Sequence, residues 1–202
     1  MSKRDSLDLK IVVLGPAGVG KTCIINRYCN GSFQTDTMST IGAGFFTHTL
    51  IIDHTDVTLM LWDTAGEERF QSVAPSLLRG ASGVILTFDL TKFDSFQGID
   101  TYMEMFLNTC QIPSGIDYPV LLLGNKSDLE ERVIGNDLVE DWKKRNNVSL
   151  YYEVSAKTGS NINEAFETFL KRFVIPVENS KSIPIQIILD PNVSNNSQNR
   201  CC

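Results

Sequence analysis

Five short apolar runs, each the length of one buried strand, alternate with helix-length amphipathic stretches over the first 175 residues. The runs are rich in Val, Ile and Leu and lack polar alternation, as expected of parallel strands that are buried on both faces. They are LKIVVLG (9–15), VTLMLWD (57–63), GVILTFD (83–89), PVLLLGN (119–125) and LYYEVSA (150–156). This alternation predicts an α/β fold with a largely parallel sheet.

Between the runs, the apolar spacing predicts helices over 21–31, 94–109, 137–147 and 161–175. The last helix opens with Asn161 and Glu164 at close to capping-box spacing. A sixth run, FFTHTLIID (45–53), meets VTLMLWD through His54-Thr55-Asp56, which predicts a hairpin. The expected architecture is a three-layer α/β sandwich, with a mixed six-stranded sheet and one antiparallel edge strand.

The chain has 202 residues, enough for one ordinary domain with some chain to spare. We assign the domain to residues 1–176 and a flexible tail to 177–202, where the composition shifts to Asn, Ser and Gln. Within the tail, IPIQIIL (183–189) is too short to cross a bilayer. It is expected either to dock on a partner or to pack back on the domain.

A net charge of -6 with no basic block argues against nucleic acid as a partner, because phosphate contacts require clustered Lys and Arg. The charged N-terminus, MSKRDSLDLK, does not resemble a signal peptide, so we expect a cytosolic protein. The scattered Cys23, Cys29 and Cys110 do not form a disulfide framework and are expected to be reduced, half-buried packing residues.

The segment Gly15-Pro16-Ala17-Gly18-Val19-Gly20-Lys21-Thr22 fits the pattern G-x-x-x-x-G-K-[ST] between a predicted strand and a predicted helix. In such a loop, backbone N–H groups surround phosphates and the helix N-terminus adds positive potential. Lys21 is expected to reach the outer phosphates, and the Thr22 hydroxyl to ligate magnesium. A chance glycine turn is the alternative, but the flanking strand and helix favour a nucleoside triphosphate site.

The segment Asn125-Lys126-Ser127-Asp128 follows the run that ends at Asn125, where α/β sheets place ligands. The Asp128 carboxylate can accept hydrogen bonds from the ring N–H and the exocyclic amine of guanine, whereas adenine does not offer that pair of donors. Ser155-Ala156-Lys157 stands in the equivalent place after the last strand. These residues predict guanine, and they disfavour an adenine-specific ATPase or kinase.

Two further segments are expected to sense the terminal phosphate. Asp63-Thr64-Ala65-Gly66 closes a strand, where the carboxylate can hold the magnesium shell and the Gly66 N–H can face a γ-phosphate. Thr40 lies upstream, in a stretch that ends STIG. Together they predict a sensor on each side of the phosphate.

The motifs GPAGVGKT, STIG, WDTAGEERF, NKSD and SAK, in this order, resemble the Ras superfamily of small GTPases. STIGAGF, LLRGA (77–81), LTFDLT (86–91) and the final Cys-Cys resemble the Rab subfamily, regulators of vesicle traffic. The resemblance covers about residues 9–175 and the last two residues. It implies a GTPase that converts GTP and water to GDP and phosphate, and that recruits effectors when GTP is bound.

The resemblance also assigns residues. It implies that Thr22 and Thr40 bind Mg²⁺ with Asp63 in the outer shell, and that Lys21, Thr40, Gly66 and Glu67 surround the reaction. The nucleotide-contacting set is Gly15, Pro16, Ala17, Gly18, Val19, Gly20, Lys21, Thr22, Cys23, Phe33, Thr40, Asp63, Gly66, Asn125, Lys126, Asp128, Ser155, Ala156 and Lys157. Phe33 is expected to flank the base.

Four residues depart from the family pattern. Glu67 stands where Gln is usual, and a carboxylate offers no amide donor to the charged transition state. Ala17 replaces a glycine found in the Ras relatives, Thr37 replaces an aromatic residue and Gly44 an acidic one. The first two predict slow unassisted hydrolysis, with a largely non-hydrolysing GTP-binding module as the alternative. The last two predict a looser first switch.

Surface and membrane roles follow from the same resemblance. Phe45 and Trp62 match two members of an aromatic triad that resembles the effector-reading surface of Rab proteins, and Leu77 stands at the third position; ordinary core packing is the alternative. His48 and His54 are expected to be solvated rather than ligands. Cys201 and Cys202 imply geranylgeranyl anchors on the cytosolic face of an endomembrane or vesicle. The implied partners are an exchange factor, a GTPase-activating protein, effectors and a prenyl-binding escort.

Overall fold

The structure is a computed structural model that describes residues 6–34, 40, 42–66, 74–112 and 118–174. Six strands and five helices are described within those ranges. In chain order they are β1 Ser6–Leu14, α1 Lys21–Asn30, β2 Ala43–Ile52, β3 Thr55–Thr64, α2 Ala74–Leu78, β4 Gly83–Asp89, α3 Phe93–Cys110, β5 Val120–Asn125, α4 Asn136–Asn146, β6 Leu150–Glu153 and α5 Ile162–Val174.

The six strands form one sheet in the order β2-β3-β1-β4-β5-β6. Strand β2 pairs antiparallel with β3 at one edge, and every other pairing is parallel. Strands β4 and β5 are buried along their whole length, whereas β2 alternates between half-buried and exposed residues. The predicted mixed sheet with one antiparallel edge strand is therefore confirmed.

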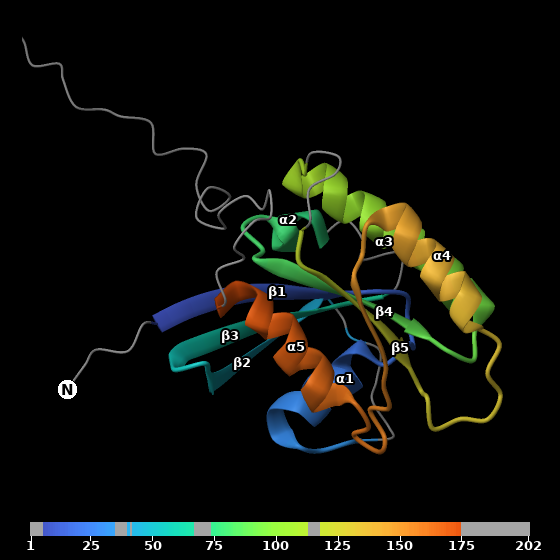
Figure 1. Cartoon of the computed structure of the whole chain (residues 1–202), viewed down its shortest axis with the longest axis horizontal. Helices are drawn as coiled ribbons and strands as arrows, with labels where there is room; N and C mark the ends of the chain where they lie inside the picture. The colour runs from blue at the N-terminus through green and yellow to red at the C-terminus, as the bar shows by residue number, and fades with distance from the viewer. Residues whose placement is uncertain (1–5, 35–39, 41, 67–73, 113–117, 175–202) are drawn as a thin grey trace, which may run out of the picture.

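Helices cover both faces of the sheet, with α1 and α5 on one side and α2, α3 and α4 on the other (Figure 1). Alternate residues of β1 point into two separate cores, as the pleat requires. Val12 and Leu14 belong to the core under α3 and α4, while Ile11 and Val13 belong to the core under α1 and α5. The sheet is thus the middle layer of the predicted sandwich.

Local boundaries differ from the sequence predictions in several places. The hairpin turn is Asp53-His54, earlier than the predicted His54-Thr55-Asp56, with positive φ values of 44° and 69°. Two residues at positive φ form the tight turn that matches the twist of the flanking strands. Strand β6 ends at Glu153 rather than at 156. Helix α2 was not predicted, because five residues are too few to show a helical period.

The N-terminus of α5 also differs from the capping-box prediction. Asn161 has a φ of 59° and precedes the helix, and its side-chain amide donates to the Glu153 carbonyl oxygen at 2.8 Å. The side chain therefore ties the loop after β6 back to the strand. No helix in the described part of the chain has the length and apolar character to cross a bilayer.

The parallel strands bring five loops to one edge of the sheet. The loops follow β1, β3, β4, β5 and β6, whose carboxyl ends all point the same way. Strand β1 lies between β3 and β4. The connection after β1 leads to β2 and β3 on one side of it, and the chain then crosses to β4 on its other side. Ligands of open α/β sheets bind at such a point. Four of the five predicted motifs follow β1, β3, β5 and β6, while Thr40 of the fifth lies between α1 and β2.

Candidate nucleotide-binding site

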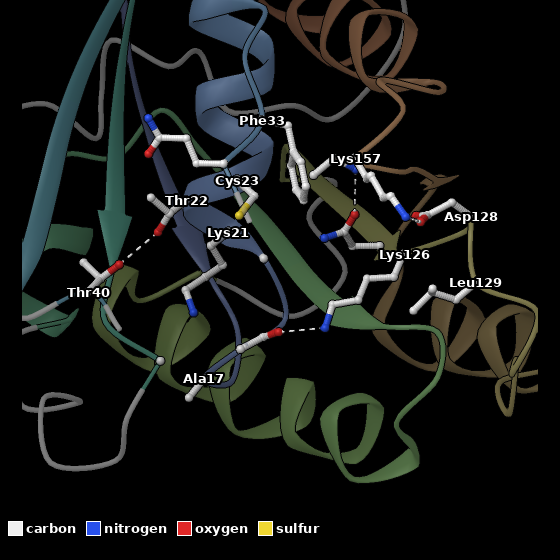
Figure 2. Close-up of a pocket in the computed structure, with 16 residues that line it drawn as sticks. Ala17, Lys21, Thr22, Cys23, Phe33, Thr40, Lys126, Asp128, Leu129 and Lys157 are labelled. Carbon is white, nitrogen blue, oxygen red and sulfur yellow. Dashed lines mark hydrogen bonds and ion pairs between the residues drawn. The ribbon is translucent and has the colours of Figure 1, made fainter. Parts of the chain in front are cut away.

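A cavity of about 340 Å³ opens at this edge of the sheet (Figure 2), within the size range of small-molecule sites. Fourteen of the predicted residues line it, namely Ala17, Gly18, Gly20, Lys21, Thr22, Cys23, Phe33, Thr40, Gly66, Asn125, Lys126, Asp128, Ala156 and Lys157. Gly15, Pro16, Val19, Asp63 and Ser155 are not in the lining. Gln34 and Leu129 line the cavity without having been predicted. Glu67 lies outside the described residues.

The loop between β1 and α1 needs glycine at two points of close approach. Gly15 has a φ of 147°, and a Cβ there would lie 2.2 Å from the Thr87 carbonyl oxygen. Gly20 has a φ of 96°, and a Cβ there would lie 2.3 Å from the side-chain nitrogen of Asn125. Any larger residue would push this loop away from β4 and β5. The two glycines therefore allow the loop to pack closely against β4 and β5.

Lys21 is the first residue of α1 and is 6% exposed. Its Nζ donates to the carbonyl oxygens of Gly15 at 2.7 Å and Pro16 at 2.9 Å. Burial lowers the pKa of Lys21 to about 8, although the nearby Asp63 carboxylate acts in the opposite direction. The folded chain thus holds an ammonium group in a site that disfavours its charge, and an anion in the cavity would stabilise that charge.

Three oxygen-bearing side chains meet beside Lys21. The Thr22 hydroxyl donates to Asp63 Oδ2 at 2.6 Å and lies 2.9 Å from the Thr40 hydroxyl, which is 3.3 Å from the same carboxylate oxygen. Burial raises the pKa of Asp63, and the contacts with Thr22, Lys21 and Thr40 lower it in part. The other carboxylate oxygen, Oδ1, is buried without a hydrogen-bond partner among the described residues.

Asn125 joins the loops after β1, β5 and β6 at the opposite end of the cavity. Its side-chain nitrogen donates to the Val19 carbonyl oxygen at 2.8 Å, and its Oδ1 accepts from the Ala156 N–H at 3.1 Å. The side-chain amide of Asn125 is buried and cannot bond to water in the folded chain, so these two hydrogen bonds satisfy its nitrogen and its oxygen. Asn125 therefore fixes the spacing between the three loops.

Lys126 makes a second link between the loop after β5 and the loop between β1 and α1, which is the predicted phosphate loop. Its Nζ donates to the Gly18 carbonyl oxygen at 2.9 Å and lies 2.6 Å from Asp89 Oδ2. Burial raises the pKa of Asp89, but the bonds from Lys126 and Thr91 outweigh burial and hold the pKa below its usual value. Asp89, at the end of β4, is thus a charged support for Lys126 that the sequence analysis did not single out.

Asp128 lies in the loop after β5, and its side chain is 14% exposed. The Ser155 hydroxyl donates to one of its carboxylate oxygens at 2.6 Å, and the Lys157 ammonium is 3.9 Å from the other. Figure 2 places Asp128 beside Lys157, across the cavity from Thr22 and Thr40. The carboxylate edge therefore stands at the far end of the cavity from the hydroxyl cluster.

Arg27, on α1, was also missed by the sequence analysis. Its guanidinium donates to the carbonyl oxygens of Ala156 at 2.9 Å, Lys157 at 2.7 Å and Gly31 at 2.7 Å. Gly31 is the C-cap of α1, two residues before Phe33. Arg27 thus clamps the loop after β6 to the end of α1. The contact joins residues about 130 positions apart, and no local sequence signal announces it.

The predicted effector triad is divided in the structure. Phe45 is 52% exposed and packs against the half-buried Trp62, with 4.9 Å between ring centroids. Leu77 is half-buried and packs against the core under α3. Phe45 is therefore available to a partner, whereas Leu77 also has the core-packing role that was the alternative.

A strand–loop–helix phosphate site and a carboxylate at the opposite end of one cavity define a P-loop nucleotide-binding protein. Residues 10–174 match the model of the Ras family, so the chain belongs to the Ras family. The chain is 35% identical to the mouse Ras-related protein Rab-7b over the full length of both chains. It is also 38% identical to the Ypt/Rab-type GTPase Rab7 of Gibberella zeae, over 90% of this chain and 89% of that one.

A third relative, the bovine Ras-related protein Rab-7b, is 37% identical over 85% of each chain. These matches confirm the resemblance to Rab proteins that the sequence motifs indicated. The chain is a GTPase of the Rab type, which binds GTP and GDP and acts in membrane traffic. An adenine-specific ATPase or kinase, the rival from another class, is excluded.

Proposed function

We propose that this chain is a membrane-anchored switch that binds Mg²⁺ with GTP or GDP in the cavity and recruits effectors in the GTP form. The observation that carries the proposal is the convergence of five separated motifs on one cavity of about 340 Å³. The hydroxyl cluster stands at one end and the Asp128 carboxylate at the other. One nucleotide with its cation would use every motif together.

The guanine base is proposed to lie between Phe33 and the loops after β5 and β6. Asp128 is the acceptor for the ring N–H and the exocyclic amine, and Ser155 holds the carboxylate from the side by a 2.6 Å hydrogen bond. Adenine would leave the carboxylate without those donors, which is a costly mismatch in a site built to be hydrogen-bonded. Recognition of guanine is therefore proposed to depend on side chains that are already held in place by hydrogen bonds between the loops.

The hydroxyl cluster fits Mg²⁺, which prefers hard oxygen ligands and often takes one or two from the protein and the rest from phosphates and water. Thr22 and Thr40 are the proposed ligands, and Asp63 supports the shell with Oδ1, which is buried and has no hydrogen-bond partner among the described residues. When bound, the ion neutralises charge on the outer phosphates. Removing magnesium should therefore speed nucleotide release.

GTP hydrolysis is proposed to proceed by positioning and charge stabilisation. Water attacks the γ-phosphorus while the bond to the β-phosphate oxygen breaks, giving GDP and phosphate. Lys21 and the loop N–H groups stabilise the developing negative charge, and Gly66 offers its N–H to the γ-phosphate. Lys21 is supported in this role by its place beside the loop carbonyls and by the buried setting that favours an anionic partner.

Glu67 is proposed to slow unassisted hydrolysis, because a carboxylate adds negative charge where it already accumulates. Ala17 lines the cavity and is proposed to restrict access near the γ-phosphate. An arginine supplied by a GTPase-activating protein is worth roughly 10³–10⁵-fold in GTPases, so assisted turnover is compatible with this proposal. Exchange factors, effectors and a prenyl-binding escort are the other proposed partners.

Single-turnover hydrolysis tests the proposal for Glu67. Wild type and Glu67→Gln are loaded with GTP, and phosphate release is followed with and without a GTPase-activating domain. We expect Glu67→Gln to hydrolyse GTP faster than wild type when unassisted. If the substitution leaves the unassisted rate unchanged, Glu67 has no part in the reaction.

The domain of residues 1–176 is proposed to be anchored through the tail of residues 177–202, with geranylgeranyl groups on Cys201 and Cys202. A single modest lipid binds membranes only marginally without a basic patch. The tail has no net charge, because Lys181 and Arg200 offset Glu178 and Asp190. Two lipid groups are therefore expected to be needed for stable membrane binding. Location on the cytosolic face of an endomembrane or vesicle follows from this proposal.

Membrane fractionation of wild type, Cys202→Ser and the Cys201→Ser/Cys202→Ser double variant tests the anchor. We expect the single variant to bind membranes weakly and the double variant to be released. A double variant that stays on membranes like wild type would assign anchoring elsewhere, with the apolar stretch 183–189 as the next candidate.

A further inference from the structure

One face of α3 contacts the two loops that hold Pro16 and Gly66, at the phosphate end of the site. Gly98 and Tyr102 are four residues apart in this helix and therefore lie on the same face. A Cβ on Gly98 would lie 2.9 Å from Cγ of Pro16, so the proline ring packs directly on the helix. The Tyr102 hydroxyl donates to the Gly66 carbonyl oxygen at 3.2 Å. The same helix face thus reaches two loops of the site.

Those two loops are also in close contact with each other. A Cβ on Gly66 would lie 2.4 Å from the Ala17 backbone nitrogen and 2.5 Å from the Pro16 carbonyl oxygen. A residue with a side chain would not fit there without moving one of the loops. Gly66 is therefore held between the phosphate loop and the hydroxyl of Tyr102.

Tyr102 is fixed by the core and does not line the cavity. Its side chain is 3% exposed and belongs to the core cluster that contains Phe96, Ile99 and Phe106. Gly66, by contrast, has no side chain with which to anchor itself. A hydrogen bond from a rigid core group to its carbonyl oxygen would select one position of the glycine among several.

We propose that Tyr102 is a positioning residue that holds Gly66 against the phosphate loop and so favours GTP over GDP. A group that stabilises one arrangement of a switch increases the affinity of the ligand that binds that arrangement. The inference rests on the proposed function only for the contact between the Gly66 N–H and the γ-phosphate. Tyr102 itself is assigned no contact with the nucleotide.

The test is Tyr102→Phe in the full chain, which keeps the ring and removes the hydroxyl. Dissociation is measured for labelled GDP and for a labelled β,γ-imido analogue of GTP. We expect the analogue to dissociate about 3- to 10-fold faster than from wild type, the size expected for loss of one hydrogen bond. GDP release should change by less than about twofold, because GDP has no γ-phosphate for Gly66 to meet.

Tyr118→Phe is the matched control. The Tyr118 hydroxyl also donates to a backbone carbonyl oxygen, that of Ala81 at 2.5 Å, and its ring packs on Phe106 of α3. It does not line the cavity. This variant should lower the thermal midpoint without separating the two dissociation rates.

Equal changes for both nucleotides, or none, would reduce Tyr102 to a structural residue and overturn the inference. The ratio of the two rates stays readable if the variant is destabilised, because only folded protein carries nucleotide. If wild type prefers guanine nucleotides and the ratio does not move, the inference alone fails. If wild type binds adenine nucleotides equally well, the proposed function fails and takes the inference with it.

Discussion

The two ends of the cavity differ in which contacts between segments are most numerous. At the base end, the side chains of Asn125, Lys126 and Arg27 donate to backbone carbonyl oxygens of other loops. At the phosphate end, Thr22, Thr40 and Asp63 contact one another. Bonds to backbone fix one loop relative to another. Contacts between polar side chains can instead be exchanged for a cation and phosphate oxygens without moving a strand.

This difference matches what the nucleotide presents to each end. The base is the same in GTP and GDP, so the loops that read it gain from being held in one place. The terminal phosphate is present in one state and absent in the other, so we propose that the groups around it have two arrangements. In the proposed binding mode, Gly66 lies at the end that differs between GTP and GDP, and Asp128 at the end that is the same in both. Substitutions at the two ends should therefore differ in whether they distinguish GTP from GDP.

The largest effect is expected for Asp128→Asn at the base end. The amide cannot accept both donors of guanine and brings an N–H against one of them, so GDP and GTP affinity should each fall by about 100-fold or more. Xanthine nucleotides, which carry a carbonyl in place of the exocyclic amine, should instead bind more tightly than to wild type, because that carbonyl can accept a hydrogen bond from the new amide. Titration with labelled nucleotides measures all three.

Glu130→Gln is the control for Asp128→Asn, because it changes the charge of an exposed residue in the same loop. It should bind GDP as wild type does. Unchanged GDP affinity in Asp128→Asn would mean that the carboxylate does not read the base.

A smaller effect is expected for Arg27→Met, which keeps the apolar stem and removes three donors. The loop after β6 would lose its clamp to α1, so GDP and GTP should both dissociate roughly 10-fold faster, in line with the loss of charge-assisted hydrogen bonds. Arg145→Met, an exposed change on α4, is the control. Faster release of GTP but not of GDP would contradict this prediction, because it would mean that Arg27 acts on the terminal phosphate rather than on the base.

The last prediction concerns the pH dependence of stability at the phosphate end, where the change is gradual within any one pH unit. Burial lowers the pKa of Lys21 from 10.5 to about 8. Between those values the unfolded chain binds a proton that the folded chain does not, so the Lys21 contribution to stability rises with pH, by at most about 1.4 kcal/mol per pH unit. The stability of wild type minus that of Lys21→Met, without nucleotide, should therefore rise from about pH 8 to 10.5.

Taking this difference removes an opposing effect. Burial raises the pKa of the Cys29 and Cys110 thiols from 9.0 to about 11. As pH rises from 9 to about 11, the raised pKa values of these thiols lower the stability of the folded state. The decrease is the same in wild type and in Lys21→Met. Saturating GDP should flatten the difference, because the phosphates favour the charged lysine. A difference that is flat without nucleotide would contradict the buried, weakly basic Lys21.

The sequence predicted the sheet because each strand carries its own signal. The runs ending at Asp89 and Asn125 are apolar throughout, and the strands they predict are buried throughout. The hairpin turn was wrong by one or two residues, since Asp53 and His54 adopt positive φ without a glycine to mark them. Helix α2 was missed because five residues leave no periodic pattern.

The site was predictable as far as local motifs reach. Residues that contact the nucleotide in the resembling family stand in short motifs, and fourteen of those predicted line the cavity. Arg27, Asp89 and Tyr102 were not predicted, because each acts through one or more contacts between distant segments. Such supporting residues carry no pattern in one sequence and become visible only when the loops are brought together.

The most direct test of guanine recognition by one cavity is a competition titration on the wild-type full chain with Mg²⁺ present. Labelled GDP is bound first and then displaced with unlabelled GDP, GTP, ADP or ATP. The Asp128 carboxylate predicts that GDP and GTP compete effectively, while ADP and ATP are weaker by roughly 10⁴-fold or more. Adenine nucleotides that displace the label as well as GDP does would contradict the account.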